Sequence, residues 1–231
     1  MQSKIYDNLA SRWSPGPNRR NSVVGTYDSH NAWEDYDTFL FKGIETEGKV
    51  ALEYGAGPGR NMIKFASRFA RIDGVDISAI NRQKAIYNCQ LSRIPAGYQY
   101  FVCDGSNIPA EANSYDVVFS TICFQHICCH SIRYSILENC YRVLKKGGSL
   151  CFQMGYGGKE KHERGEAVLS SYYDNSYDAI ETNGGHDVSI TDENELKNDL
   201  SNIGFCDFRF DIRPTGPGDT HRNWIFVRVT K

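Results

Sequence analysis

Three glycines spaced by single residues are the most distinctive chemical feature of the sequence. Gly55, Gly57 and Gly59 follow the acidic Glu53, which gives the pattern E-x-G-x-G-x-G. A glycine-rich turn between a strand and a helix lets a ligand approach the backbone closely, near the positive end of the helix. The turn therefore predicts a nucleotide-like ligand.

The residue after the third glycine separates two kinds of nucleotide ligand. In the dinucleotide pattern G-x-G-x-x-G, a third small residue allows the helix to pack closely on the strand. Arg60 occupies that position here. A long cation fits the dinucleotide pattern poorly, which argues against a nicotinamide-dependent oxidoreductase, an enzyme class that uses a similar sheet.

The segments that position this turn alternate between strand-like and helix-like patterns. Strand-like runs occupy residues 49–54, 72–77, 98–103, 115–122 and 149–154. Apolar residues at helical spacing predict helices over residues 61–70, 79–91 and 131–146 between them. Near the C-terminus the patterns predict a helix over 191–203 and strands over 205–212 and 223–229. Repeated β-α units predict an α/β, doubly wound fold with helices on both faces of a mostly parallel sheet.

Two segments depart from this alternation. Residues 1–45 precede the first strand and include Trp13, Tyr27, Trp33 and Tyr36, which predict a segment that packs on the sheet, caps the ligand cleft, or does both. Residues 46–231 then form the main domain. Within it, residues 156–190 lack clean periodicity. Long loops inside compact domains are usually functional, so we predict a lid on the substrate side.

Further motifs follow the glycine turn in order. The acidic residue Asp76 ends the second predicted strand, and Asp104 follows the third. The sequences Y-D-V-V at 115–118 and L-K-K-G-G-S-L at 144–150 come later. With these motifs, residues 49–155 resemble the class I, Rossmann-like S-adenosylmethionine-dependent methyltransferases, and the C-terminal elements resemble them more loosely.

This resemblance implies a fold and a cofactor. The fold is a seven-stranded, mostly parallel sheet with an antiparallel last strand, and the cofactor is S-adenosylmethionine. In the family the residue at Asp76 binds the ribose hydroxyls, the one at Ile77 packs on the adenine, and the one at Asp104 contacts the adenine amino group. The implied cofactor-binding residues are Glu53, Gly55, Gly57, Gly59, Asp76, Ile77, Asp104, Gly105 and Cys123. Carboxylates accept hydrogen bonds from hydroxyl and amino groups, and a partly negative site suits a sulfonium cation.

The methyl acceptor is expected at the loop after the fourth strand, because ligands of open α/β sheets bind outside the carboxyl ends of the strands. Histidine is the usual base near neutral pH, which favours His126 as the catalytic base, with Gln125 in the same pocket. Two further catalytic candidates are His186, beside Asp187 after a flexible turn, and His221, before the last strand.

Two other features of these segments have competing interpretations. Tyr172 and Tyr173 are candidates for stacking on a substrate ring or for anchoring the lid. His126, Cys128, Cys129 and His130 resemble a metal-ligand set. Because adjacent cysteines cannot easily point at one ion, we predict that no metal is bound there.

Composition limits the class of partner. The 231 residues carry a formal net charge of −2, so bulk electrostatics do not favour a nucleic acid. The sequence contains no secretory signal and no apolar run of membrane-spanning length, which predicts a cytoplasmic protein without a membrane partner.

We expect a small polar methyl acceptor, such as a metabolite or sugar, methylated at oxygen. Methylation at nitrogen or carbon, a protein or RNA substrate and a catalytically silent binding module are the alternatives, and the oligomeric state is left open.

Overall fold

The computed structural model describes residues 2–11, 35–159, 161–162, 165–166, 169–175, 187–215 and 221–231. Trp13, Tyr27, Trp33 and His186 lie outside this part of the chain.

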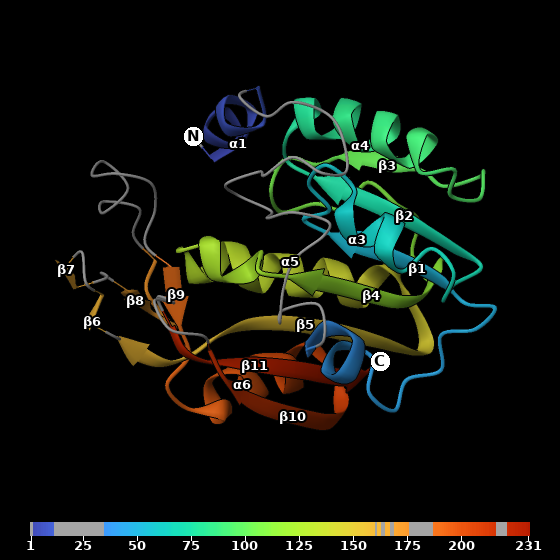
Figure 1. Ribbon diagram of the computed structural model, residues 1–231. Helices are drawn as coiled ribbons and strands as arrows, with labels where there is room; N and C mark the ends of the chain where they lie inside the picture. The colour runs from blue at the N-terminus through green and yellow to red at the C-terminus, as the bar shows by residue number, and fades with distance from the viewer. Residues whose placement is uncertain are drawn as a thin grey trace.

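Seven strands form one sheet in the order β10-β11-β5-β4-β1-β2-β3 (Figure 1). The strands are β1 (Val50–Tyr54), β2 (Arg71–Asp76), β3 (Tyr100–Val102), β4 (Tyr115–Thr121), β5 (Leu144–Lys159), β10 (Cys206–Pro214) and β11 (His221–Thr230). β11 is antiparallel to both β5 and β10, whereas the other neighbouring pairs are parallel. The prediction of a mostly parallel sheet with an antiparallel last strand is confirmed.

Helices connect the strands and cover the sheet (Figure 1). They are α1 (Gln2–Ser11), η1 (Tyr36–Leu40), α3 (Arg60–Lys64), α4 (Ala79–Leu91), η2 (Phe124–His126), α5 (His130–Val143) and α6 (Glu193–Ile203). Ser78 caps α4 by accepting a hydrogen bond from the Asn81 amide, and Asp192 caps α6 by accepting from Asn194. Gly204, with a φ of 115°, ends α6 in the left-handed conformation.

Two predicted helices are shorter than their patterns indicate. α3 ends at Lys64, and the residues after it form turns. α5 ends at Val143, because Leu144 already pairs with Tyr115 of β4 and so begins β5. Lys145, expected in the last turn of that helix, instead forms an ion pair with Asp116 at 3.0 Å.

Apolar side chains fill both faces of the sheet because successive residues of a strand point in opposite directions. Leu52 and Val118 belong to a core cluster with α5 and α6, whereas Ala51 and Phe119 belong to a cluster with η1 and α3. The second cluster is aromatic: the ring of Phe119 lies within about 6.3 Å of those of Phe41, Phe65 and Phe69.

The two irregular segments both contact the main domain where the structure describes them. α1 lies beside α4 (Figure 1), and Asp7 accepts a hydrogen bond from the Ser78 hydroxyl at 2.5 Å. Four short strands lie in the predicted lid: β6 (Lys161–His162), β7 (Gly165–Glu166), β8 (Leu169–Ser171) and β9 (Asp187–Ser189). β9 pairs with β8, and Ile190 bridges to Tyr156 at the end of β5. None of the described helices is long and apolar enough to cross a membrane.

Phe119→Ala tests the aromatic layer. Phe119 is fully buried, so loss of its ring should lower the free energy of unfolding by about 3–5 kcal/mol through lost burial and a residual cavity. Urea denaturation measures this change. Tyr87→Ala, at a side chain that is 51% exposed, is the control and should change stability by no more than about 0.5 kcal/mol. Equal effects of the two substitutions would contradict this account of the core.

Candidate active site

The glycine turn is held against the end of the neighbouring strand β2. The amides of Gly55 and Ala56 both donate to the carbonyl of Val75, at 2.8 and 3.1 Å. Gly55 has a φ of 74°, and a Cβ on it would lie 2.4 Å from Sγ of Cys123. Glycine is therefore required at residue 55 by its torsion angle and by close packing.

Asp76 completes this attachment from the last position of β2. Its carboxylate accepts hydrogen bonds from the Gly57 amide at 2.9 Å, the Ser78 amide at 2.8 Å and the Asn81 side chain at 3.2 Å. Burial raises the pKa of Asp76 above its ordinary value, although these three donors oppose the shift.

Glu53 contributes a second buried carboxyl group beside the turn. Oε1 accepts a hydrogen bond from the Asn61 amide group at 2.8 Å, whereas Oε2 is buried with no partner among the described residues. Burial raises the pKa of Glu53 to about 8, against the opposing effects of Asn61 and the Arg60 cation. An unpaired buried oxygen of this kind is satisfied when a ligand brings a donor or a cation.

These groups surround a cavity of about 830 Å³ that is partly open to solvent. It lies at the carboxyl ends of β1, β2 and β4, as expected for an open α/β sheet. The lining comes from the glycine turn, the strand ends and the loops after them, and from α1, α3, α4 and η2: Tyr6, Glu53, Tyr54, Gly55, Ala56, Gly57, Arg60, Asn61, Asp76, Ile77, Asn81, Gly105, Thr121, Ile122, Cys123, His126 and Ile127.

Most of the implied cofactor residues line this cavity, but two do not. A Cβ added at Gly59 would lie 3.2 Å from Cβ of Ala85, so this glycine lets α4 approach the turn closely. Asp104 is exposed, and its Oδ1 accepts hydrogen bonds from the amides of Ser106 and Asn107 at 2.9 and 2.8 Å. Those bonds lower the pKa of Asp104. Its implied adenine contact stays a prediction.

One wall of the cavity contains a histidine that is bonded to a carboxylate outside the lining. His126, at the end of η2, lines the cavity, and its Nδ1 lies 2.6 Å from Oδ1 of Asp187 at the start of β9. Burial favours protonation of Asp187, but hydrogen bonds from His126 and His221 outweigh it and hold the pKa of Asp187 below its ordinary value. The carboxylate of Asp187 is therefore ionised and accepts a hydrogen bond from the protonated Nδ1 of His126.

Two other predicted residues approach the cavity only through Asp187. Gln125 donates to Oδ2 of Asp187 at 3.3 Å, and Nε2 of His221 lies 3.3 Å from the same oxygen. Neither lines the cavity, and the side chain of His221 is fully buried. His221, predicted as a catalytic candidate, therefore lies outside the cavity lining. It reaches Oδ2 of Asp187 from the first position of β11.

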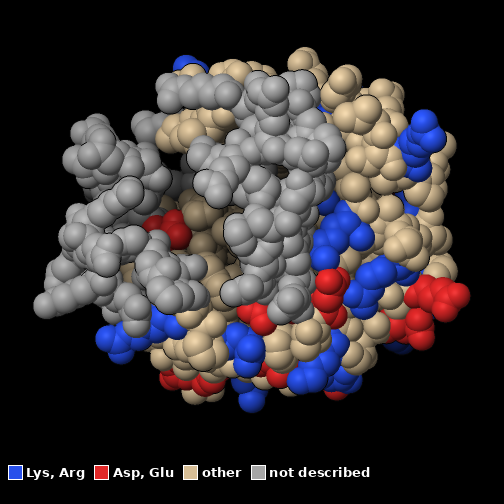
Figure 2. All heavy atoms as spheres, viewed as in Figure 1, with Lys and Arg blue, Asp and Glu red and all other residues tan. Residues whose placement is uncertain are grey.

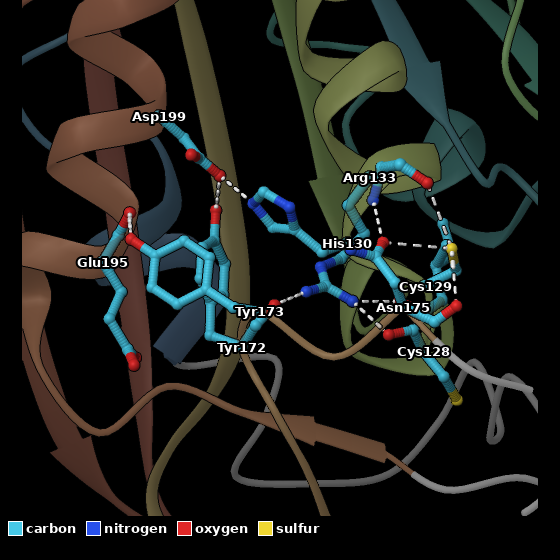
Figure 3. Close-up of polar contacts among 11 residues, drawn as sticks. Cys128, Cys129, His130, Arg133, Tyr172, Tyr173, Asn175, Glu195 and Asp199 are labelled. Carbon is cyan, nitrogen blue, oxygen red and sulfur yellow. Dashed lines mark hydrogen bonds and ion pairs between the residues drawn. The ribbon is translucent and has the colours of Figure 1, made fainter.

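The prediction that Tyr172 and Tyr173 contact substrate does not match their positions, because neither lines the cavity. Tyr172 is buried and donates to Oδ2 of Asp199 in α6 at 2.5 Å, and its carbonyl accepts a hydrogen bond from Arg133 of α5 (Figure 3). Tyr173 is 46% exposed and packs on the ring of His130. Both residues anchor the segment after β8, which was the alternative interpretation.

The cysteine and histidine side chains after β4 have separate partners. His126 bonds Asp187, His130 bonds Asp199 at 2.7 Å, and Sγ of Cys129 lies 3.2 Å from the Ser131 hydroxyl. Among the residues that the structure describes, no group of three or more His, Cys, Asp and Glu side chains is arranged to hold a metal ion.

Sequence patterns missed several residues of the cavity wall. Tyr6 reaches it from α1, which lies in the segment predicted to pack on the sheet or cap the cleft, although Tyr6 itself was not predicted. Asn61 is a buried polar residue on a predicted helix, and it bonds Glu53 and Thr121 at 2.8 Å each. A polar side chain two residues after the third glycine was the available signal for Asn61.

Comparisons with known proteins agree with this geometry. Residues 52–152 match the family described as "Methyltransferase domain". An uncharacterized methyltransferase of Anoxybacillus flavithermus is 25% identical over 149 residues, which cover 64% of this chain and 64% of that protein. A tRNA (carboxymethyluridine(34)-5-O)-methyltransferase of Xenopus tropicalis is 21% identical over 151 residues, covering 63% of this chain and 19% of that one. The matches thus span less than two thirds of either relative.

A solved structure shows the same fold. Phosphoethanolamine N-methyltransferase 2 of Haemonchus contortus, in complex with phosphomonomethylethanolamine and S-adenosylhomocysteine, superposes with a TM-score of 0.64 at 20% identity. The superposition covers 90% of this chain and 55% of that one. Residues 52–152 therefore match a methyltransferase domain, and the chain has the class I methyltransferase fold. The glycine cradle and the unpaired Glu53 oxygen fit the cofactor of this family, S-adenosylmethionine.

Glu53→Gln tests the buried acid through the pH dependence of stability. The pKa of Glu53 is about 8 in the folded chain and 4.5 ordinarily. Between these two pH values the folded chain keeps a proton on this carboxyl group that the unfolded chain has lost. Its contribution to stability is complete below pH 4.5 and is lost as the pH rises towards 8, by up to about 1.4 kcal/mol per pH unit. Urea unfolding of the ligand-free proteins across this range should show a shallower decline for Glu53→Gln. Parallel curves would contradict the shift.

Asp76→Asn tests the ribose role. The variant keeps the size of the side chain but loses the anionic acceptor, so we expect calorimetry to show about tenfold or greater loss of S-adenosylhomocysteine affinity. Asp73→Asn is the matched control, because Asp73 is also buried on β2 but does not line the cavity. Its affinity should equal that of the wild type. The ribose role is refuted by equal affinities of all three proteins.

Proposed function

We propose that the chain transfers the methyl group of S-adenosylmethionine to a hydroxyl group of a small polar molecule. The observation that carries this proposal is that His126, which lines the same cavity as the glycine turn and Asp76, is bonded through Nδ1 to Asp187. When bound, S-adenosylmethionine supplies an electrophilic methyl group and departs as a neutral thioether.

The pair provides a base for the acceptor hydroxyl. Nδ1 of His126 donates to the ionised Asp187, so Nε2 is the nitrogen with the lone pair. Formation of the new oxygen–carbon bond releases the hydroxyl proton to Nε2, and the positive charge of the sulfonium passes to the imidazolium. General base catalysis of this kind contributes about 10²- to 10⁴-fold to a rate. A neutral amine also loses a proton on methylation, which keeps nitrogen methylation as the second candidate.

The size of the cavity and the charge of the chain support a small acceptor. The cavity, whose volume of about 830 Å³ includes open solvent, must hold the adenosyl group as well, which limits the room for an acceptor. On the face drawn in Figure 2, basic and acidic side chains of the described residues are intermixed, and the net charge is −2. The absence of a nucleic-acid substrate stays a prediction, since one relative is named as a tRNA methyltransferase.

Fractionated cell extract tests the acceptor class. The chain is incubated with S-adenosylmethionine labelled in its methyl group and with dialysable small molecules, total protein or total tRNA in separate reactions. We expect label to enter the dialysable fraction and to resist mild base as an ether does. Label in the tRNA or protein fraction alone would overturn the small-molecule proposal.

His126→Gln tests the base. The glutamine side chain is similar in size to histidine and its amide can still donate to Asp187. It has no basic nitrogen, so turnover should fall about 10²-fold or more. The affinity for S-adenosylhomocysteine should stay at the wild-type value, because the adenosyl end is formed by other residues. Turnover is measured with the acceptor fraction identified above. Full activity in this variant would remove His126 as the base.

A further inference from the structure

Donors from distant parts of the chain surround the carboxylate of Asp187. Oδ1 lies 2.6 Å from Nδ1 of His126, and Oδ2 lies 3.3 Å from Nε2 of Gln125 and 3.3 Å from Nε2 of His221. Asp187 opens β9, Gln125 and His126 lie in η2, and His221 begins β11. A carboxylate only accepts hydrogen bonds, so each of these nitrogens carries a proton towards it.

His221 is the least accessible of these groups, and its side chain is fully buried. Burial of a polar ring costs free energy unless hydrogen bonds offset the loss of water. Space for the ring comes from Gly155 of β5, where a Cβ would lie 2.2 Å from both Nδ1 and Cε1 of His221. The imidazole therefore fits only because residue 155 has no side chain.

The backbone around Asp187 is fixed independently of His221. The Ile190 amide donates to the Gly155 carbonyl at 3.2 Å, and the Gly157 amide donates to the Ile190 carbonyl at 2.8 Å. These bonds attach the end of β9 to β5 beside the His221 ring. His221 contributes to the direction of the Asp187 side chain, because it holds Oδ2 together with Gln125 and leaves Oδ1 towards His126.

We propose that His221, seated against Gly155, positions Asp187 and thereby fixes the ring orientation and tautomer of His126. An oriented carboxylate on Nδ1 keeps the proton on that nitrogen and the lone pair on Nε2. The inference rests on the proposed function and deepens it, since it names a buried second histidine as a positioning residue for the base.

Two substitutions of His221 that differ in reach test this role. The amide nitrogen of His221→Gln comes near the position of Nε2, whereas that of His221→Asn comes near Nδ1 and cannot reach Asp187. In the full chain saturated with S-adenosylhomocysteine, side-chain ¹⁵N NMR should show His126 protonated at Nδ1 in the wild type and in His221→Gln. His221→Asn should show an averaged tautomer, and the signal is assigned by its loss in His126→Gln.

Gly155→Ala supplies an independent variant, because it keeps both imidazoles and displaces only the ring of His221. We expect the same averaged His126 signal as in His221→Asn. The control is His130→Gln, since His130 bonds Asp199 rather than Asp187. That variant should leave the His126 signal unchanged even where it lowers the melting temperature.

The outcomes separate this inference from the proposed function. A wild-type His126 signal in Gly155→Ala and in His221→Asn overturns the positioning role, as does an averaged signal in His221→Gln. If His221→Asn does not fold, the Gly155→Ala result decides alone. Failure of the wild type to bind S-adenosylhomocysteine in calorimetry refutes the proposed function instead, and the tautomer is then measured in the ligand-free chain.

Discussion

The hydrogen bond from the Gly57 amide to the Asp76 carboxylate holds the ligand cavity in shape. β1 and β2 are neighbouring parallel strands, so the turn after β1 and the carboxyl end of β2 meet at the same edge of the sheet. Gly55 and Ala56 donate to Val75, and Gly57 donates to Asp76. Buried amides need such partners, so this edge of the cavity exists only while β2 ends in an acceptor at residue 76.

The acids of the site are divided between two ends with opposite electrostatic behaviour. Burial raises the pKa values of Glu53 and Asp76 beside the turn, so their ionisation is favoured when a ligand brings donors or positive charge. At the other end, histidine donors outweigh burial and keep Asp187 ionised. The proposed reaction, which would move positive charge from a sulfonium to the imidazole of His126, suits this division.

The errors of sequence interpretation have a common physical origin. Tyr172 lies in a segment without periodicity, and its partner Asp199 is 27 residues further along the chain. The aromatic composition of that segment suggested that Tyr172 stacks on a substrate ring, whereas its packing between α5 and α6 gives Tyr172 an anchoring role. Gly59 matched a motif for ligand contact, yet glycine is favoured there by its φ of 84° and by the close approach of Ala85 of α4. In both cases, the neighbour that decides the role belongs to a different element.

The order of strands and helices, the glycine turn and Asp76 follow from the sequence by itself. These features depend on local properties: alternation of apolar residues, the torsion angles open to glycine, and an acid at the end of a strand. The arrangement of His126, Asp187 and His221 was decided only by the tertiary structure. Asp187 is 61 residues from His126 and 34 from His221, so no local spacing links them. They meet because β9 attaches beside β5 and the antiparallel β11 brings its first residue to the same edge.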